Sequence, residues 1–223
     1  AMVSTYLRKL TIPQEYKGKR AILVFDGVMA RYELYVNGEK VTEHRGGYSR
    51  SFVDITQYLS EGENTLVMMV DSTENPDIPP FGYAIDYMCF GGIYRDVNLY
   101  LAEDIWIENL LVRYELNGNE AILYPELQTG NAGGAFDGKV TVKLSAPDGS
   151  MVKTYSQTVS FAAGHGKAVM EKVNVGEITR WDMDNPCLYT VQVSVEKDGT
   201  VQDDKSARIG FRTVECRPDG FFL

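Results

Sequence analysis

The sequence predicts an all-β protein built from two antiparallel β-sandwiches. Nearly every periodic stretch alternates apolar and polar residues with a period of two, as in 31–36 and 189–196. This alternation is typical of strands that bury one face and expose the other to water. Turn-forming dipeptides separate the stretches, and a length of 223 residues suits two modest domains.

The first half of the chain contains strands at 22–25, 32–36 and 93–101 in this prediction. Asn37-Gly38 follows the second of them and favours a tight hairpin, because both residues tolerate the positive φ angles of such turns. The one helical feature expected is a single turn at 56–59.

The second half repeats the pattern, with strands predicted at 140–144 and 189–195. Three further hairpins are predicted, at Asn117-Gly118, Asp148-Gly149 and Asp198-Gly199. We interpret the acidic pair Asp203-Asp204 as a solvated turn. One strand ends and a new alternating run begins near 102–104, which predicts two domains, 1–102 and 103–223.

Composition excludes several classes of partner and cofactor. A net charge of −9, without a stripe of lysine and arginine, argues against binding to nucleic acid. No apolar run approaches the ~20 residues of a membrane-spanning helix, and the first residues show no secretion signal, so we expect a cytoplasmic protein without membrane contact. The three cysteines, Cys89, Cys187 and Cys216, are spaced neither for disulfides nor for zinc.

The long stretch 72–89 interrupts the strand pattern. It carries three prolines and several aromatic residues and is longer than most loops of compact domains. We interpret it as a binding or docking loop, with a surface excursion packed on its own aromatic residues as the equal alternative.

A glycine pair, Gly91-Gly92, follows this loop and allows close approach of the backbone to another surface. Arg95 falls on the apolar face of the strand predicted at 93–101. An unpaired guanidinium is costly there, so we expect Arg95 to reach the rim of the sheet or to meet a carboxylate. Gly91, Gly92 and Arg95 are therefore predicted to be structural anchors.

Six segments of the first half, in order and spacing, resemble the sugar-binding domain of glycoside hydrolase family 2. They are 22–28, 33–38, 46–48, 53–59, 61–66 and 91–97. The second half resembles the immunoglobulin-like domain of the same family through Trp181, 185–190, 209–212 and 219–223. The resemblance implies a jelly-roll-like (galactose-binding-like) sandwich over 1–102 and an immunoglobulin-like sandwich over 103–223.

Family members continue into a (β/α)₈ barrel that carries two catalytic glutamates, and this chain stops about where that barrel would begin. The resemblance therefore implies a non-catalytic N-terminal fragment of a retaining glycosidase, closest to the β-galactosidases, that docks on its missing barrel. No residue of the chain is expected to be catalytic. The chain itself is expected to hold no cofactor, and its metal ligands stay unknown; sodium or magnesium would belong to the full-length parent, which could be a homo-oligomer.

The same resemblance implies a substrate-contacting role for Asp86, with its neighbour Tyr87. An aspartate six residues before the second glycine contacts the terminal sugar in the family's β-galactosidases, and Asp86 occupies that position. Tyr94 stands where β-glucuronidases tend to have histidine, which favours a β-galactoside as the sugar.

Other candidate catalytic residues in the sequence are less well supported. Asn119-Glu120 matches the acid/base dipeptide of the family's barrel but follows a predicted hairpin turn, so we reject it as catalytic. His44 and His165 lie in different predicted domains, without an adjacent nucleophile.

A free-standing carbohydrate-binding module and a structural tandem sandwich are the alternative functions. Removal of a barrel would leave Phe81, Tyr83, Tyr87 and Phe221-Phe222 exposed.

Overall fold

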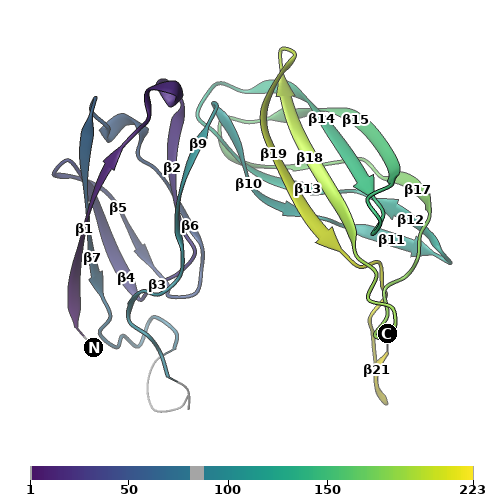
Figure 1. Cartoon of the computed structure of the whole chain (residues 1–223). Helices are drawn as coiled ribbons and strands as arrows, with labels where there is room; N and C mark the ends of the chain where they lie inside the picture. Colours follow the sequence, from purple (N-terminus) through teal and green to yellow (C-terminus); the bar gives the residue numbers. More distant parts are fainter. Residues whose placement is uncertain (1, 81–87, 223) are drawn as a thin grey trace. The chain divides into compact units, whose positions relative to one another are not determined.

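The structure is a computed structural model that describes residues 2–80 and 88–222. The chain divides into two compact units, Ala1–Ala102 and Glu103–Leu223 (Figure 1). The described residues form antiparallel strands and two short 3₁₀ helices, η1 (Gln14–Tyr16) and η2 (Thr56–Tyr58), so the prediction of an all-β fold is confirmed. No helix of the described residues is long and apolar enough to cross a membrane.

The first unit is a sandwich of a four-stranded and a three-stranded sheet. The larger sheet has the order β1-β7-β4-β5 and consists of β1 (Val3–Thr11), β7 (Glu63–Asp71), β4 (Arg31–Val36) and β5 (Glu39–Arg45). The smaller sheet has the order β6-β2-β9 and consists of β6 (Ser51–Asp54), β2 (Arg20–Phe25) and β9 (Val97–Ala102). A short pair, β3 (Val28–Met29) with β8 (Gly92–Ile93), lies at the base of the long loop.

The core of the first unit lies between these two sheets. Tyr32, Leu34 and Val36 of β4 are buried, as their alternation predicts, and pack with Leu23 and Phe25 of β2. The predicted helical turn is η2, where the Asp54 carboxylate accepts hydrogen bonds from both the backbone N–H and the hydroxyl of Thr56.

The second unit contains three sheets and a C-terminal hairpin. The four-stranded sheet consists of β15 (Met151–Phe161), β14 (Phe136–Ser145), β18 (Tyr189–Lys197) and β19 (Thr200–Ile209). The three-stranded sheets consist of β10 (Ile105–Leu111), β13 (Glu126–Asn131) and β16 (Gly164–Val169), and of β11 (Tyr114–Asn117), β12 (Glu120–Leu123) and β17 (Val173–Glu177). The hairpin is β20 (Glu215–Arg217) with β21 (Gly220–Phe222).

The core of the second unit is formed by the apolar faces of these sheets. Alternate residues of β14 and β18 are fully buried and meet Phe211 in a single cluster that includes Val142 and Val193. The four dipeptides predicted to form hairpins all connect paired strands, and Asn37 and Asp198 adopt a φ of 50°, so the predicted hairpins are confirmed.

Two local predictions were wrong. The strand expected at 93–101 is broken, because β8 ends at Ile93 and β9 begins at Val97. The pair Asp203-Asp204 is part of β19 rather than a solvated turn. The Asp203 carboxylate accepts a hydrogen bond of 2.6 Å from the backbone N–H of Ile107, the residue before a β-bulge in β10.

Candidate functional site

The candidate site is the long loop at one end of the first unit. Its predicted substrate-contacting residues, Asp86 and Tyr87, lie outside the described residues, as do Phe81 and Tyr83. The described part is the base of the loop, which consists of an outgoing arm that begins at Ser72 and a returning arm that reaches β9. Both arms are held by specific contacts.

Ser72 joins the two arms through its hydroxyl group. Its Oγ donates a hydrogen bond of 2.9 Å to the carbonyl oxygen of Met29 and accepts one of 3.0 Å from the backbone N–H of Gly92. Residues 72 and 92 are thereby fixed to each other and to β3, so the loop leaves and re-enters the sandwich at one point.

The glycine pair makes this junction sterically feasible. A Cβ atom at Gly91 would lie 2.6 Å from Ser72 Oγ, closer than nonbonded atoms approach. At Gly92 a Cβ would collide with the hydroxyl of Tyr6, and the φ angle of +89° is one that side-chain-bearing residues rarely adopt. Both positions therefore require glycine for a structural reason.

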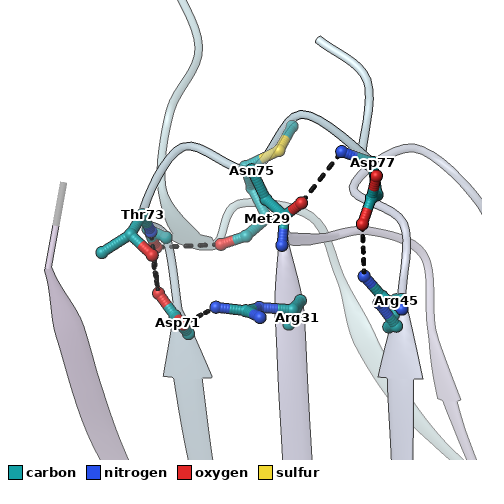
Figure 2. A network of polar contacts seen from close by, with 8 residues as sticks. Met29, Arg31, Arg45, Asp71, Thr73, Asn75 and Asp77 are labelled. Atoms are coloured by element: carbon teal, nitrogen blue, oxygen red, sulfur yellow. Dashed lines mark hydrogen bonds and ion pairs between the residues drawn. The ribbon is translucent and has the colours of Figure 1, made fainter. Parts of the chain in front are cut away.

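The outgoing arm is held by the carboxylate at the end of β7. Asp71 accepts hydrogen bonds from the hydroxyl and the backbone N–H of Thr73, at 2.5 and 2.9 Å, and pairs with the guanidinium of Arg31 (Figure 2). The Thr73 hydroxyl, its backbone N–H and then Arg31 keep the pKa of Asp71 below its ordinary value. Asp71 is therefore ionised at neutral pH.

Farther along the outgoing arm, a second turn is held in the same way. The side chain of Asn75 accepts a hydrogen bond of 2.9 Å from the backbone N–H of Asp77, whose carboxylate lies 3.7 Å from Arg45 (Figure 2). Ile78 is buried against Met29 and Ala30 and anchors the arm by its apolar side chain.

The returning arm is held by Tyr94 and Arg95. The Tyr94 hydroxyl donates a hydrogen bond of 2.7 Å to the carbonyl oxygen of Gly47. The Arg95 guanidinium lies 5.1 Å from the centre of the Tyr94 ring and donates a long hydrogen bond of 3.4 Å to the carbonyl oxygen of Asp26. Because the chain leaves the sheet between β8 and β9, Arg95 is exposed at the rim and does not face the core.

A polar hollow adjoins the loop base on the outer face of β4 and β5. It has a volume of about 510 Å³, and its lining includes Arg31, Arg45 and Asp71 together with Glu33 and Glu43. Sequence reasoning missed these residues as neighbours of the site. The only signal was that they occupy the polar positions of alternating strands, which nearly every exposed sheet face shares.

The described residues contain no group of three or more histidine, cysteine or acidic side chains that could hold a metal ion. Asn119-Glu120 lies where the hairpin enters β12, and the Glu120 carboxylate accepts a hydrogen bond of 3.2 Å from the side-chain amide of Asn174. Trp106 is buried, and Trp181 stacks against Arg212 at 4.8 Å.

The chain thus consists of two consecutive β-sandwiches, and the first carries a long loop whose base is fixed by Ser72. Glycosidases contain β-sandwich domains of this kind. The chain belongs to glycosyl hydrolase family 2. The model of the family's sugar binding domain matches residues 1–103, and a second model of the same family matches residues 105–212. The resemblance inferred from the six segments is thus confirmed.

The relatives of the chain include both β-galactosidases and β-glucuronidases. The chain is 34% identical to a β-galactosidase of Thermoanaerobacter pseudethanolicus and 30% identical to a β-glucuronidase of Bacteroides fragilis, over 99% of its own length in both cases. It also resembles the crystal structure of a Bacteroides uniformis β-glucuronidase with a TM-score of 0.84 and 28% identity, again over 99% of the chain. The chain spans only 30%, 33% and 28% of the lengths of these three proteins.

Proposed function

We propose that this chain is the non-catalytic N-terminal part of a retaining β-galactosidase and that its 72–91 loop completes the sugar site of the whole enzyme. The observation that carries the proposal is the clamp at Ser72, which ties both arms of the loop to β3. A loop with a fixed base can present a side chain to a ligand without a large loss of conformational entropy.

Asp86 is the residue of this loop suited to sugar recognition. An ionised carboxylate is an acceptor only and binds the hydroxyl groups of a sugar through charge-assisted hydrogen bonds. Tyr87, next to it, would add an aromatic face and a hydroxyl group. In this proposal the two catalytic carboxyl groups come from the rest of the enzyme.

The charges near the loop base favour a neutral sugar over an acidic one. A glucuronide carries a carboxylate, which a binding site usually meets with an arginine or lysine. Arg31 and Arg45 are the arginines that line the hollow; Arg31 already pairs with Asp71 at the end of β7, and Arg45 already faces Asp77 of the outgoing arm. These two guanidinium groups are therefore poorly placed to add a sugar carboxylate, which supports a β-galactoside.

The first prediction concerns Asp86 in the enzyme that contains this chain. Replacement of Asp86 with alanine should lower kcat/KM for nitrophenyl β-galactoside by roughly 10- to 150-fold, since a hydrogen bond to a charged group contributes about 1.5–3 kcal/mol. The matched control is Glu39→Ala, an exposed acidic residue at the far end of β4 and β5, which should leave kcat/KM within about twofold. Equal losses in both variants, or a preference for nitrophenyl β-glucuronide, would count against the proposal.

The second prediction concerns the 223-residue chain alone. It should not hydrolyse nitrophenyl β-galactoside above a blank, and calorimetric titration should detect no galactose binding tighter than about 1 mM. One aspartate cannot offset an association cost of about 4–15 kcal/mol. Micromolar binding would instead support a free-standing carbohydrate-binding module.

A further inference from the structure

Two asparagines of the chain, Asn37 and Asn117, are followed by glycine, and the structure holds their side chains differently. Asn37 lies in the hairpin between β4 and β5, and Asn117 in the hairpin between β11 and β12. Asparagine loses its amide most readily before glycine, because glycine has no side chain to hinder attack by its own backbone nitrogen. The rate then depends on how easily the asparagine side chain reaches that nitrogen.

The side chain of Asn37 is held by three hydrogen bonds. Its Nδ2 donates to the carbonyl oxygen of Tyr58 at 2.9 Å and to Oδ1 of Asn64 at 2.8 Å. Its Oδ1 accepts from the backbone N–H of Thr65 at 2.9 Å. Asn64 is itself fully buried and held by further hydrogen bonds. These contacts oppose the rotation that brings Cγ of Asn37 to the nitrogen of Gly38.

The side chain of Asn117 has no such support. Asn117 is exposed, and among the described residues its side chain forms no hydrogen bond or ion pair. Gly118 adopts a φ angle of +60°, and a Cβ atom there would have no neighbour within 4 Å in the described part of the chain, its adjoining residues aside. The side chain and water can therefore both approach the Gly118 nitrogen.

The attacking nitrogen is equally available at the two sites. Within residues 2–80 and 88–222, the backbone N–H of Gly38 and that of Gly118 donate no hydrogen bond. The two dipeptides thus share the same chemistry and differ in how the asparagine side chain is held.

We propose that Asn117 is a site of spontaneous deamidation and that the fold protects Asn37 from the same reaction. The backbone nitrogen of Gly118 loses its proton to hydroxide and attacks Cγ of Asn117. A new N–C bond closes a succinimide ring while the C–N bond of the side-chain amide breaks, and the leaving group takes a proton from water to become ammonia. Water then adds to one carbonyl carbon of the ring and breaks its bond to the ring nitrogen, which leaves aspartate or isoaspartate.

The product changes the hairpin in two ways. Asn117 lies directly opposite Glu120, so a carboxylate at position 117 sets two like charges across the strand pair. Isoaspartate in addition lengthens the backbone by one methylene group at the edge of a tight turn. The inference does not depend on the sugar that the whole enzyme cleaves.

Peptide mass spectrometry of the 223-residue chain tests the proposal, because trypsin places Asn37 in the peptide 32–40 and Asn117 in the peptide 114–139. During incubation at mildly alkaline pH, the second peptide should gain about one dalton, which fragmentation should locate at residue 117. Asn37 should react roughly 10-fold or more slowly, since it reacts only while its hydrogen bonds are open. In concentrated urea neither side chain is held, and the two sites should react within about threefold of each other.

A pair of variants provides a second readout by ion-exchange chromatography. Asn117→Ser lacks the amide and should not form the acidic species that accumulates in the parent chain. Asn119→Ser is the matched control on the same turn and should still form it, because residue 119 precedes glutamate rather than glycine. Three results would overturn the proposal: equal rates at Asn37 and Asn117 in the folded chain, an Asn117 that reacts only in urea, or an acidic species that persists in Asn117→Ser.

Discussion

At the scale of single residues, one oxygen atom organises the candidate site. Ser72 Oγ bridges a carbonyl group of β3 and an amide that comes twenty residues later in the chain. The neighbouring glycines allow this approach, since a Cβ atom on Gly91 would lie only 2.6 Å from the hydroxyl oxygen. The site therefore depends on a serine that no motif identifies and on two glycines that a motif does identify.

The third prediction follows from this bridge. Ser72→Ala should lower the free energy of unfolding of the first unit by about 1–3 kcal/mol, because it leaves the Gly92 N–H and the Met29 carbonyl without their partner. Urea unfolding, monitored by the tyrosine signal, would measure the loss. Ser4→Ala in the neighbouring strand is the control and should cost less than about 0.5 kcal/mol. Similar small losses in both variants would contradict the assigned role.

At the scale of elements, the Asp203 carboxylate of β19 links its strand to β10 beside the bulge in β10. Ile107 lies opposite Thr129 of β13 beside the bulge, and its backbone N–H donates to the Asp203 carboxylate of β19 at 2.6 Å. Lys205 of the same strand donates to the carbonyl oxygens of Ile107 and Glu108. The two strands are therefore joined by side chains where their backbones do not pair.

The fourth prediction uses the pH dependence of this contact. Burial raises the pKa of Asp203 above its ordinary value of 3.8, although the hydrogen bonds from Ile107 and Asp204 oppose the shift. The folded state therefore binds this proton more tightly than the unfolded state, and stability is lost as pH rises from below 3.8 through the raised pKa. Asp203→Asn keeps an acceptor without the charge, so it should match or exceed the parent chain in stability at pH 7 and lose this advantage at pH 3.

A matched pair of alanine variants separates the charge from the hydrogen bond. Asp203→Ala should cost about 1–3 kcal/mol at pH 7, because the buried N–H of Ile107 loses its acceptor. Asp204→Ala, on the exposed face of β19, should cost less than about 0.5 kcal/mol. Chemical unfolding followed by tryptophan fluorescence at pH 3 and pH 7 provides both comparisons. An Asp203→Asn variant that is less stable than the parent at pH 7 would refute the argument.

At the scale of the whole chain, the two units differ in how completely their cores are closed. The second unit buries residues from all three of its sheets in one cluster. The first unit leaves an apolar groove of about 460 Å³ whose lining includes the exposed side chains of Tyr6, Leu7 and Val97. Apolar surface that stays in contact with water contributes nothing to folding, so we expect the first unit to be the less stable of the two.

The fifth prediction tests this difference. Both tryptophans of the chain, Trp106 and Trp181, lie in the second unit, so tryptophan emission reports on that unit alone. Far-ultraviolet circular dichroism reports on both units and should show an additional transition, at least ~5 °C below the midpoint of the tryptophan signal. Coincident midpoints by the two methods would show that the units unfold together.

The extent to which the sequence predicted the structure depended on the range of the interactions. Alternation in β4, β14 and β18 and the Asn-Gly and Asp-Gly turns are local patterns, and all of these elements formed as expected. The break between β8 and β9 was missed because Ile93 and Val97 stay in phase on the apolar face, so one strand was predicted through Arg95 although that residue interrupts the alternation. Only the contact of Tyr94 with Gly47, forty-seven residues away, shows why the chain leaves the sheet there.

The amino-acid sequence by itself determined the all-β class, the hairpins and the membership of glycosyl hydrolase family 2, because strand period, turn chemistry and family motifs are properties of neighbouring residues. The tertiary structure alone decided which groups meet at the loop base and which strand edges stay open. Ser72 and Gly92, or β1 and β9, are brought together by the stacking of two sheets, and no local pattern encodes a contact between residues that only packing makes neighbours.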